Sequence, residues 1–257
     1  MKTMKKTFYY IAFCLAAIAG SSCSKIDNYP SPNNTLHGQV LDAGTGAGVQ
    51  TEIGGGGTRV KLLETSYSAN PTPYYFQSMQ DGTFNNTKIF AATYKISVEG
   101  PFVPLVQTDS VGNVTVDQSQ NVVIKGSNTT TDMTFKVEPF LRVQMVGSPV
   151  FNADSTVTVQ VKVTRGTANM AYQQDITDIN LYVSNTKYDG NNNYDPRYSK
   201  LTSYNGSTGT VLLGQTISIT TTGGALPQQD VYFRVGARIN AGLDEYNYSE
   251  PVAIKYP

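Results

Sequence analysis

Tryptophan is absent from this sequence of 257 residues, histidine occurs once and cysteine twice. A zinc site needs several His or Cys ligands, so we expect no metal and no other cofactor. A Ser-His or Cys-His nucleophile would have to use His37, and no G-x-S-x-G motif accompanies it. We therefore expect His37 to be a partly exposed strand residue. Glycoside hydrolysis needs only two carboxylates and stays open on composition alone.

The N-terminal segment is basic and then apolar. Three lysines lie within the first six residues, and residues 8–20 are apolar but too short to span a membrane as a helix. Small residues then lead to Cys23, an order that resembles the lipobox of bacterial lipoproteins, although Gly20 stands where that pattern prefers Leu. The resemblance implies that residues 1–22 are a signal peptide and that Cys23 is lipidated. Lipid chains on this cysteine would anchor the protein stably.

Processing at this site would leave no cysteine for a disulfide and would shift the charge. Cys14 would be removed with the signal peptide, and Cys23 would carry lipid. Three lysines and no acid would be lost, so the formal net charge would change from 0 to −3. Nucleic-acid binding needs a basic surface, so we expect no such partner. Only 15% of residues are charged, and the abundant Asn, Thr, Ser, Gln and Tyr suit neutral polar partners.

Strand patterns fill the rest of the chain, and no segment is a convincing amphipathic helix. Residues 157–163, for example, alternate valine with Thr, Gln and Lys, which is the period of two of a β-strand. Residues 23–34 contain two prolines and no apolar periodicity, which predicts a tether. Strands are predicted in two sets, near 35–41, 58–64, 74–80, 93–99, 121–125 and 131–137, and near 140–146, 155–164, 178–184, 210–221, 231–239 and 250–256. The pattern predicts an all-β protein with two β-sandwich domains in tandem, residues 35–138 and 139–257.

Each half also carries the motifs of a known β-fold. The first half contains 38–42 (GQVLD), 45–46 (TG), 81–84 (DGTF) and 94–96 (YKI). These motifs resemble the transthyretin-like fold of carboxypeptidase regulatory domains. The second half contains 226–227 (LP), 231–237 (VYFRVGA) and 248–252 (YSEPV). They resemble the last two strands of a fibronectin type III module, although Val231 replaces the tyrosine of the usual corner.

A wider resemblance covers both halves. It is carried by 27–29 (DNY), 38–42, 81–86 (DGTFNN) and 234–238 (RVGAR). These segments are similar to the DUF3823 family of Bacteroidetes lipoproteins, whose function is unknown. Such proteins are typically encoded beside SusC-like transporters and SusD-like glycan-binding lipoproteins. The resemblance therefore implies a role in glycan capture or uptake at the outer membrane, but it supplies no established site residues.

Tyrosine is abundant, with 17 residues. Flat aromatic faces combined with amide or carboxylate groups are typical of sugar-binding sites, and two loops have this mixture. The candidate ligand-binding residues are Tyr67, Tyr74 and Tyr75 in one loop, and Tyr188, Tyr194, Arg197 and Tyr198 in the other. The alternative is that tyrosine is simply common at the rims of β-proteins, and the absence of tryptophan weighs against a sugar site.

A sheet face is the third candidate site. Alternation places Val231, Phe233, Val235 and Ala237 inward on one strand, and Ile179, Leu181 and Val183 inward on another. If the two strands pair as in a fibronectin type III sandwich, then Tyr182, Tyr232 and Arg234 share one exposed face. This face would be a platform for a glycan or a partner protein. The alternatives are simple cross-strand pairing, or burial of the face against the first domain.

Two further loops are expected to have no special chemistry. Residues 54–57 are four glycines without the Lys-Ser/Thr of a phosphate loop, so a flexible connection is expected. The segment from Asp189 to Asp195 places oxygen-bearing side chains at every second position, like the start of a calcium loop. It lacks the sixth-position glycine and the closing glutamate, because Tyr194 and Lys200 stand there. We therefore expect an Asx-rich surface loop without calcium.

These observations lead to three hypotheses from different classes. The first is a non-catalytic lipoprotein on the outside of the outer membrane that binds an oligo- or polysaccharide as an accessory of a SusC/SusD-like system. The second is a structural spacer or assembly factor that contacts the transporter and binds no sugar. The third is an enzyme, which we do not expect, because small paired sandwiches are usually binding modules.

Overall fold

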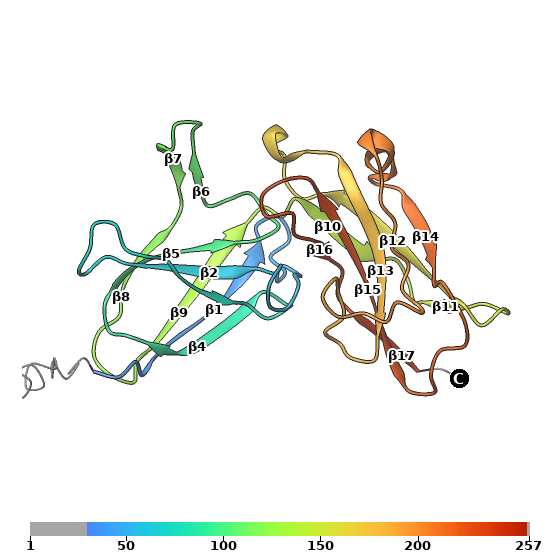
Figure 1. Ribbon diagram of the computed structural model, residues 1–257, viewed down its shortest axis with the longest axis horizontal. Coiled ribbons are helices and arrows are strands. Elements are labelled where there is room, and N and C mark those ends of the chain that lie inside the picture. The colour runs from blue at the N-terminus through green and yellow to red at the C-terminus, as the bar shows by residue number, and fades with distance from the viewer. Residues whose placement is uncertain (1–29, 256–257) are drawn as a thin grey trace, which may run out of the picture. The chain divides into compact units, whose positions relative to one another are not determined.

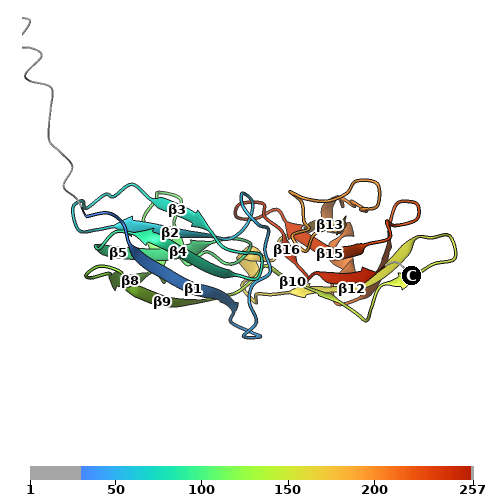
Figure 2. The same cartoon turned by 90° about the horizontal axis from the view of Figure 1, so that it is seen from below.

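A computed structural model describes residues 30–255. The predicted signal peptide and Cys23 lie outside this range. Strands β1 to β9, from blue to yellow-green in Figures 1 and 2, form a first sandwich, and β10 to β17, from yellow-green to red, form a second. Among the described residues, no helix is long and apolar enough to cross a membrane. The prediction of an all-β protein with two sandwiches in tandem is confirmed.

The first sandwich consists of two sheets and a hairpin. Its strands are β1 (Asn34–Asp42), β2 (Arg59–Glu64), β3 (Tyr74–Gln77), β4 (Thr83–Ile89), β5 (Thr93–Glu99), β6 (Val106–Thr108), β7 (Val114–Asp117), β8 (Gln120–Val123) and β9 (Thr130–Val137). One sheet has the order β4-β1-β9, with β1 and β9 parallel, and the other has the order β3-β2-β5-β8. Strands β6 and β7 pair only with each other. The two sheets enclose an apolar core that includes Val40, Val60 and Phe135.

Two glycines of the first-sandwich motifs have clear structural roles. Gly38 lies where β1 and β9 approach so closely that a Cβ would come within 2.1 Å of the Met133 carbonyl oxygen. Gly82 adopts a φ of +81°, which favours glycine, in the turn before β4. The Asp81 carboxylate accepts a hydrogen bond from the Thr83 amide at 3.0 Å and closes this turn. The Asp-Gly pair therefore forms the turn that leads into β4.

The second sandwich has its own core. Its strands are β10 (Leu141–Met145), β11 (Val150–Phe151), β12 (Val157–Arg165), β13 (Ile176–Ser184), β14 (Thr216–Thr220), β15 (Asp230–Ile239), β16 (Asn247–Tyr248) and β17 (Val252–Lys255). Short 3₁₀ turns occupy η1 (Met170–Tyr172), η2 (Gly206–Thr208) and η3 (Thr210–Leu212). One sheet is built around β12, which pairs with β10, β11 and β14, and the other around β15, which pairs with β13, β16 and β17. Valines on alternate positions of β12 fill the space between them, as the period of two requires.

Polar contacts join the two sandwiches. Asp42, at the end of β1, accepts hydrogen bonds from Nε and Nη2 of Arg142 on β10, at 2.5 and 2.8 Å. The side chain of Asn247 donates to the Pro101 carbonyl oxygen at 2.9 Å and accepts from the Leu141 amide at 3.0 Å. These groups are largely buried, so their hydrogen bonds matter for stability. The described residues from Pro32 onward accordingly form one compact unit.

Candidate functional site

The aromatic face predicted on β13 and β15 exists in register but is not exposed. Tyr182 lies directly opposite Arg234, and Tyr232 follows on the same side, opposite Ser184. Tyr182 and Arg234, however, have 0% exposure, and Tyr232 is partly buried. The expectation of an open platform is therefore wrong. The alternative, in which this face is covered, describes the structure.

Arg234 explains why the face is covered. Its guanidinium donates to the carbonyl oxygens of Ser249, Asp189 and Thr51 at 2.9, 3.1 and 3.0 Å. Its Cζ atom also lies 4.3 Å from the centre of the Tyr248 ring. Because Thr51 belongs to the first sandwich, this arginine binds the two sandwiches to each other rather than a ligand.

A second set of contacts completes the same cluster. Tyr248 donates through its hydroxyl to Glu52 at 2.7 Å, and Glu52 also accepts from the Asn192 amide at 3.2 Å. Tyr182 is packed against Tyr194, Tyr246 and Tyr248, with ring centres 5.5 to 6.2 Å apart. We call Glu52, Asp189, Arg234 and Tyr248 the junction cluster.

The tyrosines of the loop at 67–75 do not form a single platform. Tyr67 is 73% exposed, and Tyr74 and Tyr75 are consecutive residues of β3, so they point to opposite sides of the sheet. Tyr74 accepts a hydrogen bond from Asn86 at 3.1 Å. Tyr75 lies over Arg59, with 4.3 Å between the arginine Cζ atom and the ring centre.

The loop that follows β13 does bring three predicted residues together. It is fixed to its own strand, because the Asp195 amide donates to the Val183 carbonyl oxygen at 2.7 Å and Ser199 Oγ accepts from the Val183 amide at 2.9 Å. Tyr194, Arg197 and Tyr198 line one pocket, whereas Tyr188 lies outside it against Lys187.

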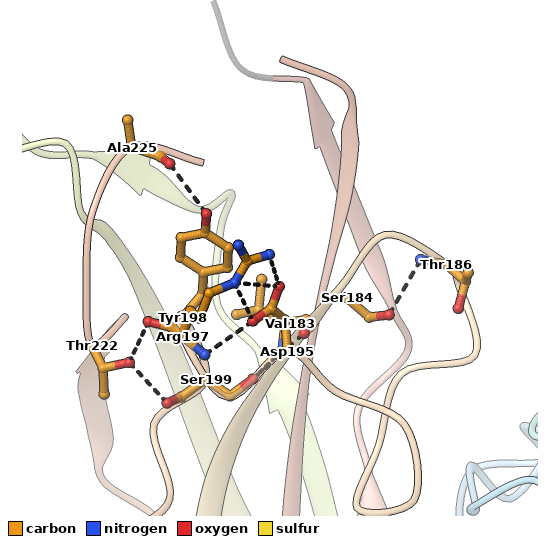
Figure 3. Close-up of polar contacts among 9 residues, drawn as sticks. All are labelled: Val183, Ser184, Thr186, Asp195, Arg197, Tyr198, Ser199, Thr222 and Ala225. Atoms are coloured by element: carbon orange, nitrogen blue, oxygen red, sulfur yellow. Dashed lines mark hydrogen bonds and ion pairs between the residues drawn. The ribbon is translucent and has the colours of Figure 1, made fainter. Parts of the chain in front are cut away.

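Arg197 and Tyr198 are held in place by neighbouring backbone and side-chain groups (Figure 3). The Asp195 carboxylate accepts from Nε and Nη2 of Arg197, at 3.0 and 2.6 Å, and these bonds lower the pKa of Asp195. The Tyr198 hydroxyl donates to the Ala225 carbonyl oxygen at 3.4 Å. Thr222 Oγ1 donates to the Arg197 carbonyl oxygen at 2.9 Å. The Arg197 Cζ atom is 5.2 Å from the centre of the Tyr198 ring.

The pocket has a volume of about 490 Å³, which is within the usual range for small-ligand sites. Its lining also includes amide side chains, prolines, two valines and a serine: Asn185, Asn193, Gln229, Pro196, Pro227, Val183, Val231 and Ser184. Aromatic rings, amides and one neutralised ion pair therefore meet in one cavity. We call this cavity, with Asp195, Arg197 and Tyr198 at its centre, the second-sandwich pocket.

The segment from Asp189 to Asp195 differs from the expected surface loop at its first residue. Asp189 has 0% exposure, and neither of its carboxylate oxygens has a hydrogen-bond partner among residues 30–255. Burial raises the pKa of Asp189 to about 7, although the nearby Arg234 guanidinium opposes the shift. Among the described residues, no group of three or more His, Cys, Asp or Glu side chains could hold a metal ion. His37 is exposed on β1 and lies 2.8 Å from Asp132.

Several pocket residues could not be found from sequence. Asn185, Pro227 and Gln229 reach the pocket because Ser184, at the end of β13, lies opposite Tyr232 near the start of β15, which places the adjoining loops together. A single amide in a loop gives no signal of such a meeting. The tyrosine-rich loop was the detectable part.

The fold and the pocket define a protein with two sandwiches in tandem and a polar, aromatic-lined cavity. A family model described as "Protein of unknown function (DUF3823) N-terminal domain" matches residues 34–137. A second, described as "Domain of unknown function (DUF3823_C)", matches residues 144–253. The chain belongs to the DUF3823 family, as its motifs predicted.

Solved structures agree with this assignment. A DUF3823 family protein from Bacteroides uniformis is 35% identical, with a TM-score of 0.79, over 89% of this chain and 100% of the other. One from Parabacteroides merdae is 22% identical, with a TM-score of 0.64, over 88% and 100%. A B. uniformis protein described as a candidate carbohydrate binding protein is 23% identical, with a TM-score of 0.59, over 87% and 99%. No curated protein matches the chain.

Proposed function

We propose that this protein is a non-catalytic glycan-binding lipoprotein and that the second-sandwich pocket is its binding site. The observation that carries the proposal is the fixed, accessible pair of Arg197 and Tyr198 among amide side chains. A tyrosine ring offers a flat apolar face to a sugar ring, and amides supply both donors and acceptors for hydroxyl groups. The B. uniformis protein that is 23% identical is described as a candidate carbohydrate binding protein, which is consistent with this function.

Preorganisation supports binding at this pocket. Binding costs free energy for each side chain that must be immobilised. Here the hydrogen bonds to Asp195 and Ala225 already hold the arginine and the tyrosine before a ligand arrives. Nη1 of Arg197 has no hydrogen-bond partner among residues 30–255, so it would be ready to donate to a sugar oxygen.

The charge of the pocket favours a neutral ligand and binding without catalysis. Asp195 and Arg197 neutralise each other. The lowered pKa of Asp195 makes it a poor general acid, which glycoside hydrolysis would need. We therefore expect neutral polysaccharides to bind without being cleaved.

Native affinity gels test the proposal. Amylopectin, xyloglucan, arabinoxylan and galactomannan would each be cast into a gel, and at least one should retard the wild-type protein. Tyr198→Ala should abolish this retardation with little change in the thermal unfolding midpoint, and Tyr67→Ser, an exposed tyrosine elsewhere, is the matched control. Equal retardation of Tyr198→Ala and wild type would contradict the proposed site. A wild type that no polysaccharide retards would favour a spacer or assembly role.

We also propose that lipid on Cys23 holds the protein on the outer membrane, facing the exterior, beside a SusC/SusD-like transporter. The lipobox-like order of the first residues supports this placement. Cys23→Ala should move the protein from the membrane fraction to the soluble fraction and abolish palmitate labelling. A variant that stays in the membrane fraction would show another attachment. Proteinase K should digest the wild type on intact cells, and full protection would place it on the periplasmic side.

A further inference from the structure

On the outer face of the first sandwich, the ring of Tyr75 lies over two cationic side chains. On the β3-β2 pair, Tyr75 lies directly opposite Lys61, and Arg59 is two residues further along on the same side. The Arg59 Cζ atom and the Lys61 Nζ atom are 4.3 and 5.8 Å from the centre of the Tyr75 ring. The ring therefore lies over β2, and it remains 36% exposed for a ligand.

These two cations share one carboxylate. Glu99 on β5 accepts from Nε and Nη2 of Arg59 at 2.8 and 2.6 Å, and from Lys61 Nζ at 3.0 Å. Burial alone would raise the pKa of Glu99, but the hydrogen bonds from Arg59 and Lys61 outweigh it and lower that pKa. Nη1 of Arg59 has no hydrogen-bond partner within residues 30–255. The group therefore has one positive charge in excess and donors to spare.

A cavity of about 370 Å³ adjoins this group. Its floor includes the buried Val98 and Phe102, and its lining also contains Tyr75, Arg59 and Glu99. Residues 104–106 of the first sandwich and 242–243 of the second complete its lining. An apolar floor with a few polar groups at its rim is the usual composition of a small-ligand site.

A buried glutamate, Glu245, lies two residues after Leu243, which lines the cavity. Glu245 is 8% exposed, and its Oε2 atom has no hydrogen-bond partner in the described part of the chain. Burial raises the pKa of Glu245 to about 7, with Arg59 opposing the shift and Glu99 adding to it. Below that pH Glu245 is largely uncharged, so it does not cancel the excess charge of Arg59 and Lys61.

We propose that this cavity is a second saccharide site and that it selects sugars that carry a carboxylate. The exposed side of the Tyr75 ring would pack against the sugar ring. Arg59, which lines the cavity, would bind the sugar carboxylate through Nη1 by charge-assisted hydrogen bonds, and Lys61, which lies beside the lining, would add positive charge. The inference rests on the proposed function only for the class of ligand, since its residues are separate from the second-sandwich pocket.

Affinity gels with polygalacturonate and alginate test this proposal, with amylopectin as the neutral comparison. Tyr75→Ser and Lys61→Gln should each reduce retardation by polygalacturonate or alginate. The apparent Kd should rise at least tenfold. Tyr67→Ser is the matched control and should leave this retardation unchanged. Thermal unfolding of each variant shows whether the fold is retained. Raising sodium chloride from 50 to 500 mM should weaken the retardation of the wild type, because the contacts are ionic.

The outcomes separate this site from the second-sandwich pocket. If neutral polysaccharides bind in a Tyr198-dependent way while neither acidic polymer retards the wild type, the second site is contradicted and the proposed function stands. Equal retardation of folded Tyr75→Ser and wild type by an acidic polymer also contradicts it. If Tyr75→Ser loses retardation by a neutral polysaccharide, and the acidic polymers do not retard the wild type, the proposed selection for charged sugars is contradicted.

Discussion

The junction cluster and the second-sandwich pocket use the same three kinds of side chain for different purposes. In the junction cluster, Arg234 has 0% exposure and packs on Tyr248. In the second-sandwich pocket, the Arg197 side chain is 73% exposed and lies beside Tyr198. Each arginine also has an aspartate nearby. The comparison shows that a tyrosine, an arginine and a carboxylate indicate neither binding nor structure until burial and partner atoms are known.

The atoms that each arginine contacts explain why one is structural and the other is available to a ligand. Arg234 donates to carbonyl oxygens from both sandwiches, so its hydrogen-bonding capacity is used within the protein. Arg197 donates hydrogen bonds to Asp195 of its own loop through Nε and Nη2. Its Nη1 atom has no hydrogen-bond partner among the described residues. A buried, saturated cation stabilises the fold, whereas an exposed, partly used one is available to a ligand.

The largest expected effect sharpens this contrast. Arg234→Met should lower the free energy of unfolding by about 3–5 kcal/mol, because it leaves the buried carbonyl oxygens of Ser249, Asp189 and Thr51 without their donors. Arg197→Met should leave the free energy of unfolding almost unchanged, since exposed ion pairs contribute little. Urea denaturation of both variants measures the difference. Similar losses for the two arginines would break the comparison.

An intermediate effect should appear in the pH dependence of stability. Burial raises the pKa of Asp189 and of Glu245 to about 7, so the native state binds these protons more tightly than the unfolded chain. Their contribution is present at low pH, falls as pH rises from about 4 to about 7, and remains lost above. The slope is at most about 1.4 kcal/mol per pH unit for each group.

Urea denaturation between pH 5 and pH 8 measures this slope. Asp189→Asn should flatten it, and Asp189→Asn with Glu245→Gln should flatten it further. Asp195→Asn is the control, because the pKa of Asp195 is lowered and its titration lies below this window. An unchanged slope in the double variant would show that neither carboxyl holds its proton.

Much of the fold could be predicted because strand alternation records burial directly. The inward valines of β12 followed from the period of two, and the pairing of β13 with β15 followed from the resemblance to a fibronectin type III module. Strand β4 was missed, since its centre reads Asn85-Asn86 and only its Phe84 and Ile89 side chains are buried. The predicted strand at 210–221 was too long, because η3 occupies its beginning and only β14 is strand.

The candidate site was less predictable. The loop around Tyr198 was recognisable from its composition, but Gln229 comes from a separate segment. The error over Tyr182 and Arg234 has a definite cause: alternation shows which side of a sheet a residue faces, but not what covers that side. Here the segment containing Thr51 and Glu52 covers it, and nothing in that segment's sequence indicates this role.

The most direct test is a crossed measurement of binding and stability on two tyrosine variants. Tyr198→Ala should lose retardation on the polysaccharide that retards the wild type and should keep its urea midpoint. Tyr182→Phe should keep full retardation and lose about 1 kcal/mol of stability, because its buried hydroxyl exchanges hydrogen bonds with Asn180 and Asn191 at 3.0 and 3.3 Å. Retained binding in Tyr198→Ala, or lost binding in a folded Tyr182→Phe, would contradict the assignment of one cluster to ligand and the other to structure.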